Sequence, residues 1–157
     1  MITLRHTTID DANTLFAWVN SPDSLEASLR TMAPIPWEQH VAWLTERLHD
    51  HGSLLLIAEQ DAEPVGQVRF QDAGEGPEVS IFVAAAHRDK GLAQEMLRLA
   101  IPLAVERWPH TPLFARIKPA NAASRSLFLS VGFRLLKEAA DHLVFNFTPS
   151  CDYERRP

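Results

Sequence analysis

The stretch that most constrains this chain spans residues 79–93 and reads VSIFVAAAHRDKGLA. An apolar run typical of a buried strand is followed by a short basic segment with one glycine, and then by a helical pattern that extends to Trp108. In such an arrangement the amides of the loop converge with the unpaired N–H groups at the start of the helix. The helix dipole adds partial positive charge at the same point. The stretch therefore predicts a site for an anion. Neither the dinucleotide fingerprint nor the P-loop fits, because both need more glycines.

The rest of the chain alternates helical and strand periodicities in a single order. Hydrophobic residues recur with the period of a helix over 12–19, 36–48, 90–108 and 121–131. Strands are predicted over 2–5, 53–59, 65–70, 79–83, 111–118, 133–137 and 143–147. Short turns join the second, third and fourth strands, which favours an antiparallel meander. We predict one α/β (α+β) domain over residues 1–148 and a polar tail over 149–157.

The helix that follows Pro36 carries two groups of side chains. Trp37, Val41, Leu44 and Leu48 fall within a narrow arc and are expected to face the core. His40, Trp43 and Arg47 lie beside that arc and are expected to border a cleft.

Composition narrows the class of protein. The chain has 157 residues, 46% of them hydrophobic, and a net charge of −5 without a basic block, which argues against a nucleic-acid partner. Cys151 is the only cysteine, and no apolar run approaches the roughly 20 residues that span a bilayer. We therefore expect a cytoplasmic protein that does not insert into a membrane. His49-Asp50-His51 lacks further ligands at metal-site spacing, so no metal is expected.

Two motifs resemble the GNAT superfamily of N-acetyltransferases. Arg88-x-x-Gly91-x-Ala93 matches the family's R/Q-x-x-G-x-G/A signature, whose loop holds the pyrophosphate of acetyl-CoA. The segment from Asn121 to Phe133 is similar to the family's N-x-x-S/A…Y-x-x-x-G-F region. The order of predicted elements also resembles the GNAT fold over nearly the whole chain, which implies a mixed, mostly antiparallel twisted sheet of six to seven strands with about four helices.

This resemblance implies acetyl-CoA as co-substrate and a set of residues that bind it. Backbone amides of the loop would hold the pyrophosphate, the strand before it would pair with the pantetheine arm, and the asparagine-led helix would contact the cofactor. The implied residues are Val83, Arg88, Asp89, Lys90, Gly91, Leu92, Ala93, Asn121, Ser124 and Phe128. Gly91 also fits on physical grounds, since a residue without Cβ lets a phosphate approach the backbone closely.

The sequence departs from the family pattern at Phe128. Many family members carry a tyrosine there that can protonate the leaving thiolate, and phenylalanine has no proton to donate. Either a water or Ser126 substitutes, or thiolate release needs no acid. The acceptor amine must be neutral to attack, which calls for a base. Glu78, with Ser80 on the same strand face, and His40 are the candidate catalytic residues.

The acceptor side rests on a narrower resemblance. Trp18-x-Asn20, Arg30-Thr31-Met32 and Pro36-Trp37-x-x-His40-x-x-Trp43 resemble the branch that acetylates nucleotide-linked amino sugars, as in pseudaminic acid biosynthesis. It implies that acceptor contacts come from Arg30, Met32, Trp37, Trp43 and Arg69. The alternative is that the tryptophans belong to the core and the arginines to the solvated surface, without any ligand. Two alternatives to this function stay open: acetylation of a protein N-terminus or another small amine, and a non-catalytic module that binds acetyl-CoA. A homodimer also stays open.

Overall fold

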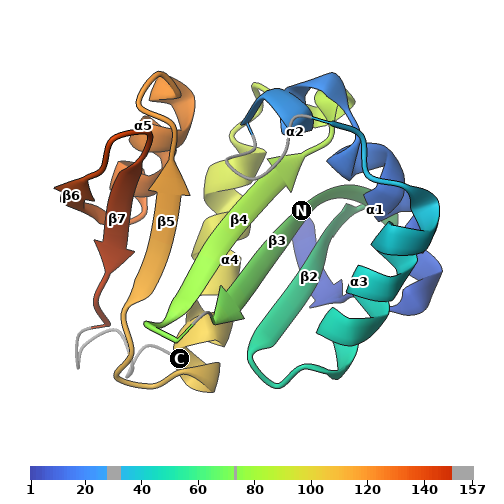
Figure 1. Ribbon diagram of the computed structural model, residues 1–157, viewed down its shortest axis with the longest axis horizontal. Helices are drawn as coiled ribbons and strands as arrows, with labels where there is room; N and C mark the ends of the chain where they lie inside the picture. The colour runs from blue at the N-terminus through green and yellow to red at the C-terminus, as the bar shows by residue number, and fades with distance from the viewer. Residues whose placement is uncertain (28–32, 73, 150–157) are drawn as a thin grey trace.

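A computed structural model describes residues 1–27, 33–72 and 74–149 (Figure 1). Five α-helices and seven strands form in these ranges, together with the short 3-10 helices Ile9–Asp11 and Ala85–His87. The helices are α1 (Ala12–Val19), α2 (Pro22–Ala27), α3 (Trp37–His49), α4 (Leu92–Arg107) and α5 (Ala122–Ser130). The strands are β1 (Ile2–His6), β2 (Ser53–Gln60), β3 (Glu63–Asp72), β4 (Pro77–Val83), β5 (Leu113–Ile117), β6 (Arg134–Glu138) and β7 (Leu143–Phe147). The predicted order of elements is confirmed, with α2 as an additional short helix between the first two predicted ones.

All seven strands belong to one sheet in the order β1-β2-β3-β4-β5-β7-β6. Every neighbouring pair is antiparallel except β4 and β5, which are parallel and share a single bridge between Glu78 and Phe114. Beyond that bridge the two strands diverge, as Figure 1 shows between the green and orange arrows. The sheet is therefore continuous at one end of β4 and open at the other.

Helices cover the two faces of the sheet unequally. On one face α4 and α5 pack onto the larger core, where Met96, Phe70 and Phe133 are among the largest fully buried side chains. On the other face α1 and α3 cover β2 through a smaller cluster of Ala12, Leu15, Leu44, Leu55 and Ile57. Strand β2 is buried on both sides, which explains its unbroken apolar run.

Capping contacts mark the start of α5 and the start of the 3-10 helix Ile9–Asp11, which runs directly into α1. Thr8 N–H donates to the Asp11 carboxylate at 2.8 Å, and the chain leaves α1 at Asn20. Asn121 caps α5 by accepting from the Ser124 amide at 3.1 Å. The helix is followed by Gly132, whose φ of +101° is one that side chains rarely adopt.

The predicted orientation of α3 is wrong in part. His40 and Leu44 are its buried residues, and Leu48 packs against the small core as predicted, whereas Trp37 is 40% exposed and Val41 is only half-buried. Trp37 is the first residue of α3, after the cap Pro36. From there it reaches only the edge of the small core, where its ring meets Phe16 edge-on at 5.1 Å. Both rings face α1, but only His40 is enclosed there, with its Nε2 atom 3.0 Å from the Ala12 carbonyl.

No helix in the described ranges is long and apolar enough to cross a membrane. The same residues contain no group of three or more histidine, cysteine, aspartate or glutamate side chains that could hold a metal ion.

Candidate functional site

The predicted anion site lies where the chain passes from β4 into α4. Gly91 caps the helix with a φ of +74°, and a Cβ placed there would meet nothing within 4 Å. The Glu95 amide donates to the Gly91 carbonyl at 3.3 Å, so the first helical amides before Glu95 have no partner inside the helix. Asp89, with a φ of +60°, adds a second left-handed residue that turns the loop back toward the helix start. The arrangement leaves space and N–H donors for an anion.

The basic side chains of this loop point elsewhere. Arg88 Nε donates to the Val83 carbonyl at 2.9 Å, and its guanidinium also forms an ion pair with Asp23 of α2. The same guanidinium carbon lies 5.5 Å from the centre of the Phe82 ring. Lys90 Nζ reaches the Ala86 carbonyl at 3.4 Å. The backbone is therefore arranged for an anion, while Arg88 connects the end of β4 to α2.

Side chains of β4 and β5 form a surface on the sheet side opposite α4, and Trp18 of α1 packs on one of them, Phe82, with ring centres 5.3 Å apart. The register of β3, β4 and β5 sets the side chains of Glu78, Ser80, Phe82, Phe114 and Arg116 on the sheet side opposite α4. We call these five residues the open face. Arg116 Nη1 donates to Glu78 Oε2 at 2.6 Å, and the glutamate side chain is 18% exposed. The predicted pair Glu78 and Ser80 thus shares one surface with an arginine.

Two of the predicted acceptor residues meet beside the open face. The guanidinium carbon of Arg69 lies 4.9 Å from the centre of the Trp43 ring, a cation–π arrangement. Arg69 is also the register partner of Ser80 on β4. Trp37 packs on Phe16 instead, and Arg30 and Met32 lie outside the described residues.

His40 occupies a different environment from Glu78. It is 3% exposed, its Nε2 atom lies 3.0 Å from the Ala12 carbonyl, and its ring is stacked with Trp43. Burial lowers the pKa of the imidazole below its ordinary value, and the hydrogen bond with Ala12 opposes that shift only in part. These contacts favour a structural role in joining α3 to α1.

In α5 and its N-cap, the predicted cofactor residues Asn121, Ser124 and Phe128 make contacts within the protein. The Asn121 side chain is engaged with the Ser124 amide. Phe128 is 3% exposed, and its ring meets Phe133 at 5.1 Å with an edge-on geometry. Phe128, where the family resemblance led us to expect a tyrosine, is therefore a packing residue.

Known proteins identify the family to which this arrangement belongs. The family model described as "Acetyltransferase (GNAT) domain" matches residues 1–134. The chain belongs to the GNAT acetyltransferase family. A curated relative, an uncharacterized protein of Methanocaldococcus jannaschii, is 24% identical over 144 residues. The chain spans only 30% of that relative's length.

Solved structures share the GNAT fold over nearly the full chain. A ribosomal-protein-alanine N-acetyltransferase from Brucella melitensis is 28% identical, with a TM-score of 0.80 over 94% of this chain and 99% of that one. The acetyltransferase yncA from Salmonella typhimurium, solved with acetyl-CoA, is 22% identical with a TM-score of 0.79 over 94% of each chain. The aminoglycoside acetyltransferase AAC(6')-Ib, solved with coenzyme A and kanamycin, is 18% identical with a TM-score of 0.79 over 94% and 95%.

GNAT domains use acetyl-CoA as co-substrate, and the residues of this chain fit that group. The space at Gly91 and the unpaired amides at the start of α4 suit a pyrophosphate. Because the β4–β5 ladder ends after Glu78, backbone groups of β4 that face β5 are outside the sheet pairing and suit an amide-bearing arm. Nδ1 of His87, in the same loop, is buried without a hydrogen-bond partner among the described residues.

Several residues of the site escaped sequence reasoning. Asp23, Phe114 and Arg116 contribute contacts that depend on which strands become neighbours. Alternation along 111–118 could have set Phe114 and Arg116 on one face of their strand. No local signal pairs that strand with β4.

Proposed function

We propose that this protein transfers the acetyl group of acetyl-CoA to a primary amine by direct attack of the amine on the thioester. The single observation that supports this is the divergence of β4 and β5 after the Glu78–Phe114 bridge. It separates an anion site at the start of α4 from the polar residues of the open face. Donor and acceptor would then approach the gap between the strands from opposite sides.

Glu78 is the residue we propose as general base. Its carboxylate lies on the open face, where Arg116 donates a hydrogen bond to the Oε2 atom. It can take the amine proton directly or through one water, a role that contributes typically 10²–10⁴-fold to the rate. Ser80, exposed two residues along the strand, is proposed to hydrogen-bond the acceptor.

No side-chain acid is proposed at the position of Phe128, because its ring is buried and carries no proton. When bound, acetyl-CoA supplies an activated acyl group. The chain contributes backbone N–H groups of β4, which can polarise a carbonyl placed between the strands. Orientation and this polarisation would carry the reaction, with the thiolate leaving without a protein acid.

We propose a nucleotide-linked amino sugar as the acceptor. The support comes from Arg69, which lies over the Trp43 ring and is the register partner of Ser80. An arginine can bind a diphosphate, and an indole can pack on a sugar or base ring. The N-terminal amine of a protein is the second candidate, supported by the likeness to the ribosomal-protein-alanine N-acetyltransferase from Brucella melitensis over 94% of this chain.

A panel assay of coenzyme A release tests the proposal. The panel contains a UDP-linked amino sugar, a peptide with an N-terminal alanine, and kanamycin. Turnover of the sugar nucleotide alone supports the first acceptor, and turnover of the peptide alone replaces it with the second. Acetyl-CoA binding without turnover of any amine would make the protein a binding module and overturn catalysis.

The role of Glu78 has its own test. Glu78→Gln should lower kcat by about 100-fold or more while leaving the Kd for acetyl-CoA unchanged. Glu138→Gln, on the exposed strand β6, makes the same chemical change away from the open face and should match the wild type. An unchanged kcat in Glu78→Gln would remove Glu78 from the mechanism.

A further inference from the structure

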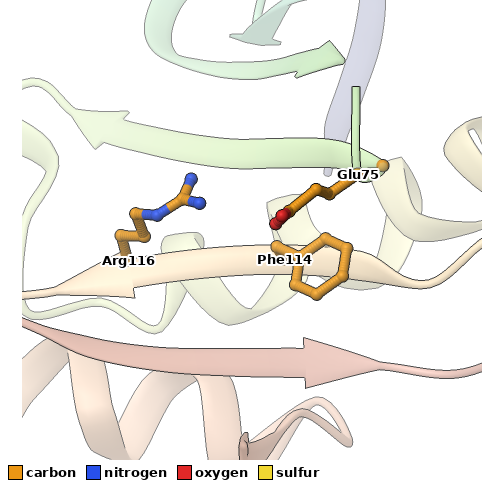
Figure 2. A pocket seen from close by; sticks show the side chains of 4 residues that line it. Glu75, Phe114 and Arg116 are labelled. Atoms are coloured by element: carbon orange, nitrogen blue, oxygen red, sulfur yellow. The ribbon is translucent and has the colours of Figure 1, made fainter. Parts of the chain in front are cut away.

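A hollow lies at the closed end of the β4–β5 pair, beside the Glu78–Arg116 ion pair. Its volume is about 190 Å³, and it is lined by Glu75, Gly76, Phe114 and Arg116. Figure 2 shows Glu75 reaching from the turn before β4 toward β5, on the side of the Phe114 ring that faces Arg116. An aromatic ring, a carboxylate and a guanidinium therefore border one small space.

The wall formed by Gly76 is fixed by close packing. A Cβ at this residue would lie 2.7 Å from the Pro112 carbonyl oxygen and 2.8 Å from the Phe114 ring, and its φ is +133°. Only glycine allows the turn before β4 to approach the start of β5 this closely. Asp72 Oδ1 also accepts from the Gly76 amide at 3.3 Å. The hollow is thus built from a constrained turn and a strand.

The two charged groups decide what the hollow can bind. Arg116 has only hydrogen-bond donors and the Glu75 carboxylate has only acceptors. An ammonium ion cannot accept from Arg116, and an ionised carboxylate or a fully ionised phosphate ester cannot donate to Glu75. A hydroxyl group does both, and neighbouring hydroxyls on one ring can reach both side chains. The C–H face of such a ring is the surface that packs on an aromatic side chain such as Phe114.

We propose that this hollow is a subsite for a neutral hydroxylated ring, the pyranose of the acceptor. It rests on the proposed function, because it gives the acceptor's sugar a place next to Glu78. Its volume is below the roughly 300–1,000 Å³ of sites that enclose a whole small molecule, so it takes one ring and leaves the nucleotide outside. Phe114 and Glu75 then act as specificity residues for the acceptor.

Binding of simple probes tests the subsite independently of turnover. The folded protein is titrated with methyl glucopyranoside, putrescine and succinate, and backbone amide shifts are followed by NMR. We expect saturable shifts at Gly76 and Phe114 with the glycoside, with a Kd on the order of 1 mM or weaker, as suits one ring. Shifts with putrescine or succinate but not the glycoside would overturn the proposal, as would no saturable shift at all.

Two variants and a control sharpen the result. Phe114→Leu keeps an apolar side chain without the ring, and Glu75→Gln keeps the shape without the charge. Each should weaken glycoside binding by about fivefold or more, whereas Glu138→Gln should not. In the coenzyme A assay, both variants should raise KM for the amino sugar with kcat nearly unchanged, whereas Glu138→Gln should leave both constants unchanged.

This design separates two failures. If the panel shows that the acceptor is a peptide, the nucleotide-sugar proposal fails, and the glycoside titration still decides whether the hollow binds a ring. If the amino sugar is acetylated but its KM is unchanged in both variants, the acceptor proposal holds and the subsite is refuted.

Discussion

Gly91 gives the sharpest test of the donor site, because it separates backbone strain from loss of space. Its φ of +74° lies in the left-handed region, yet an added Cβ would meet nothing within 4 Å. Gly91→Ala therefore introduces strain without a clash, and left-handed backbone disfavours a non-glycine residue by roughly 1–2 kcal/mol. Since 1 kcal/mol shifts Tm by about 2–4 °C in a domain of this size, thermal unfolding should detect the change.

Gly91→Glu adds a negative charge at the proposed pyrophosphate position. Two unit charges about 4 Å apart interact by about 1 kcal/mol even when fully screened by water. A pyrophosphate with two nearby charges would therefore be repelled by roughly 2 kcal/mol, or about 30-fold in Kd. Isothermal titration with acetyl-CoA should show a loss of at least this size for Gly91→Glu, and a loss below about tenfold for Gly91→Ala.

Gly74→Ala is the matched control. Gly74 also has a positive φ, of +111°, and open space around the missing Cβ, but it lies in the turn between β3 and β4. It should lower Tm while leaving the Kd for acetyl-CoA unchanged. Wild-type affinity in Gly91→Glu would falsify the placement of the pyrophosphate at the start of α4. An equal loss of affinity in Gly74→Ala and Gly91→Ala would show that strain alone weakens binding.

Three further predictions concern His40, Gly66 and Asp23. Burial holds the pKa of His40 below that of an unfolded histidine, so the unfolded chain binds the proton first and stability should fall as pH drops below about 6.5. His40→Gln should reduce this slope in Tm measured from pH 7 to 5. Gly66→Ala puts a Cβ 2.4 Å from the Phe82 carbonyl oxygen and should destabilise the protein by roughly 1–3 kcal/mol in urea unfolding, and an unchanged midpoint would contradict this packing. Asp23→Asn frees Arg88 from an exposed ion pair worth at most about 1 kcal/mol, so acetyl-CoA should bind up to about fivefold more tightly, whereas weaker binding would mean that the pair supports the site.

The sequence predicts the strand, turn and helix start around Gly91 well, because these elements depend on local backbone geometry. The strand, the turn around Gly91 and the helix start occupy consecutive residues, so their spatial relation follows from their order. The cap at Asn121 is equally local and is confirmed by its bond with the Ser124 amide. Alternation likewise predicted the shared face of Glu78 and Ser80.

What the sequence could not predict depends on contacts between distant elements. The pairing of Glu78 with Arg116 spans 38 positions and requires that β5 lie beside β4, which no local pattern encodes. The buried face of α3 was misjudged for a related reason. Periodicity gives an apolar arc, but contact with α1 decided that His40 would be enclosed and Trp37 left at the edge.

The two sides of the gap between β4 and β5 also differ in how freely they can vary. The proposed donor side would use backbone amides and a glycine, whose arrangement is inseparable from the fold. The proposed acceptor side would use side chains on an exposed sheet face, such as Ser80 and Arg116, and surface substitutions usually change stability by less than about 0.5 kcal/mol. A fold can therefore keep its donor while its acceptor changes by a few substitutions. The TM-score of 0.79 with the 18% identical aminoglycoside acetyltransferase therefore carries no information about the acceptor of this protein. The identity of the acceptor depends on the side chains of the open face and its neighbours, above all Arg69.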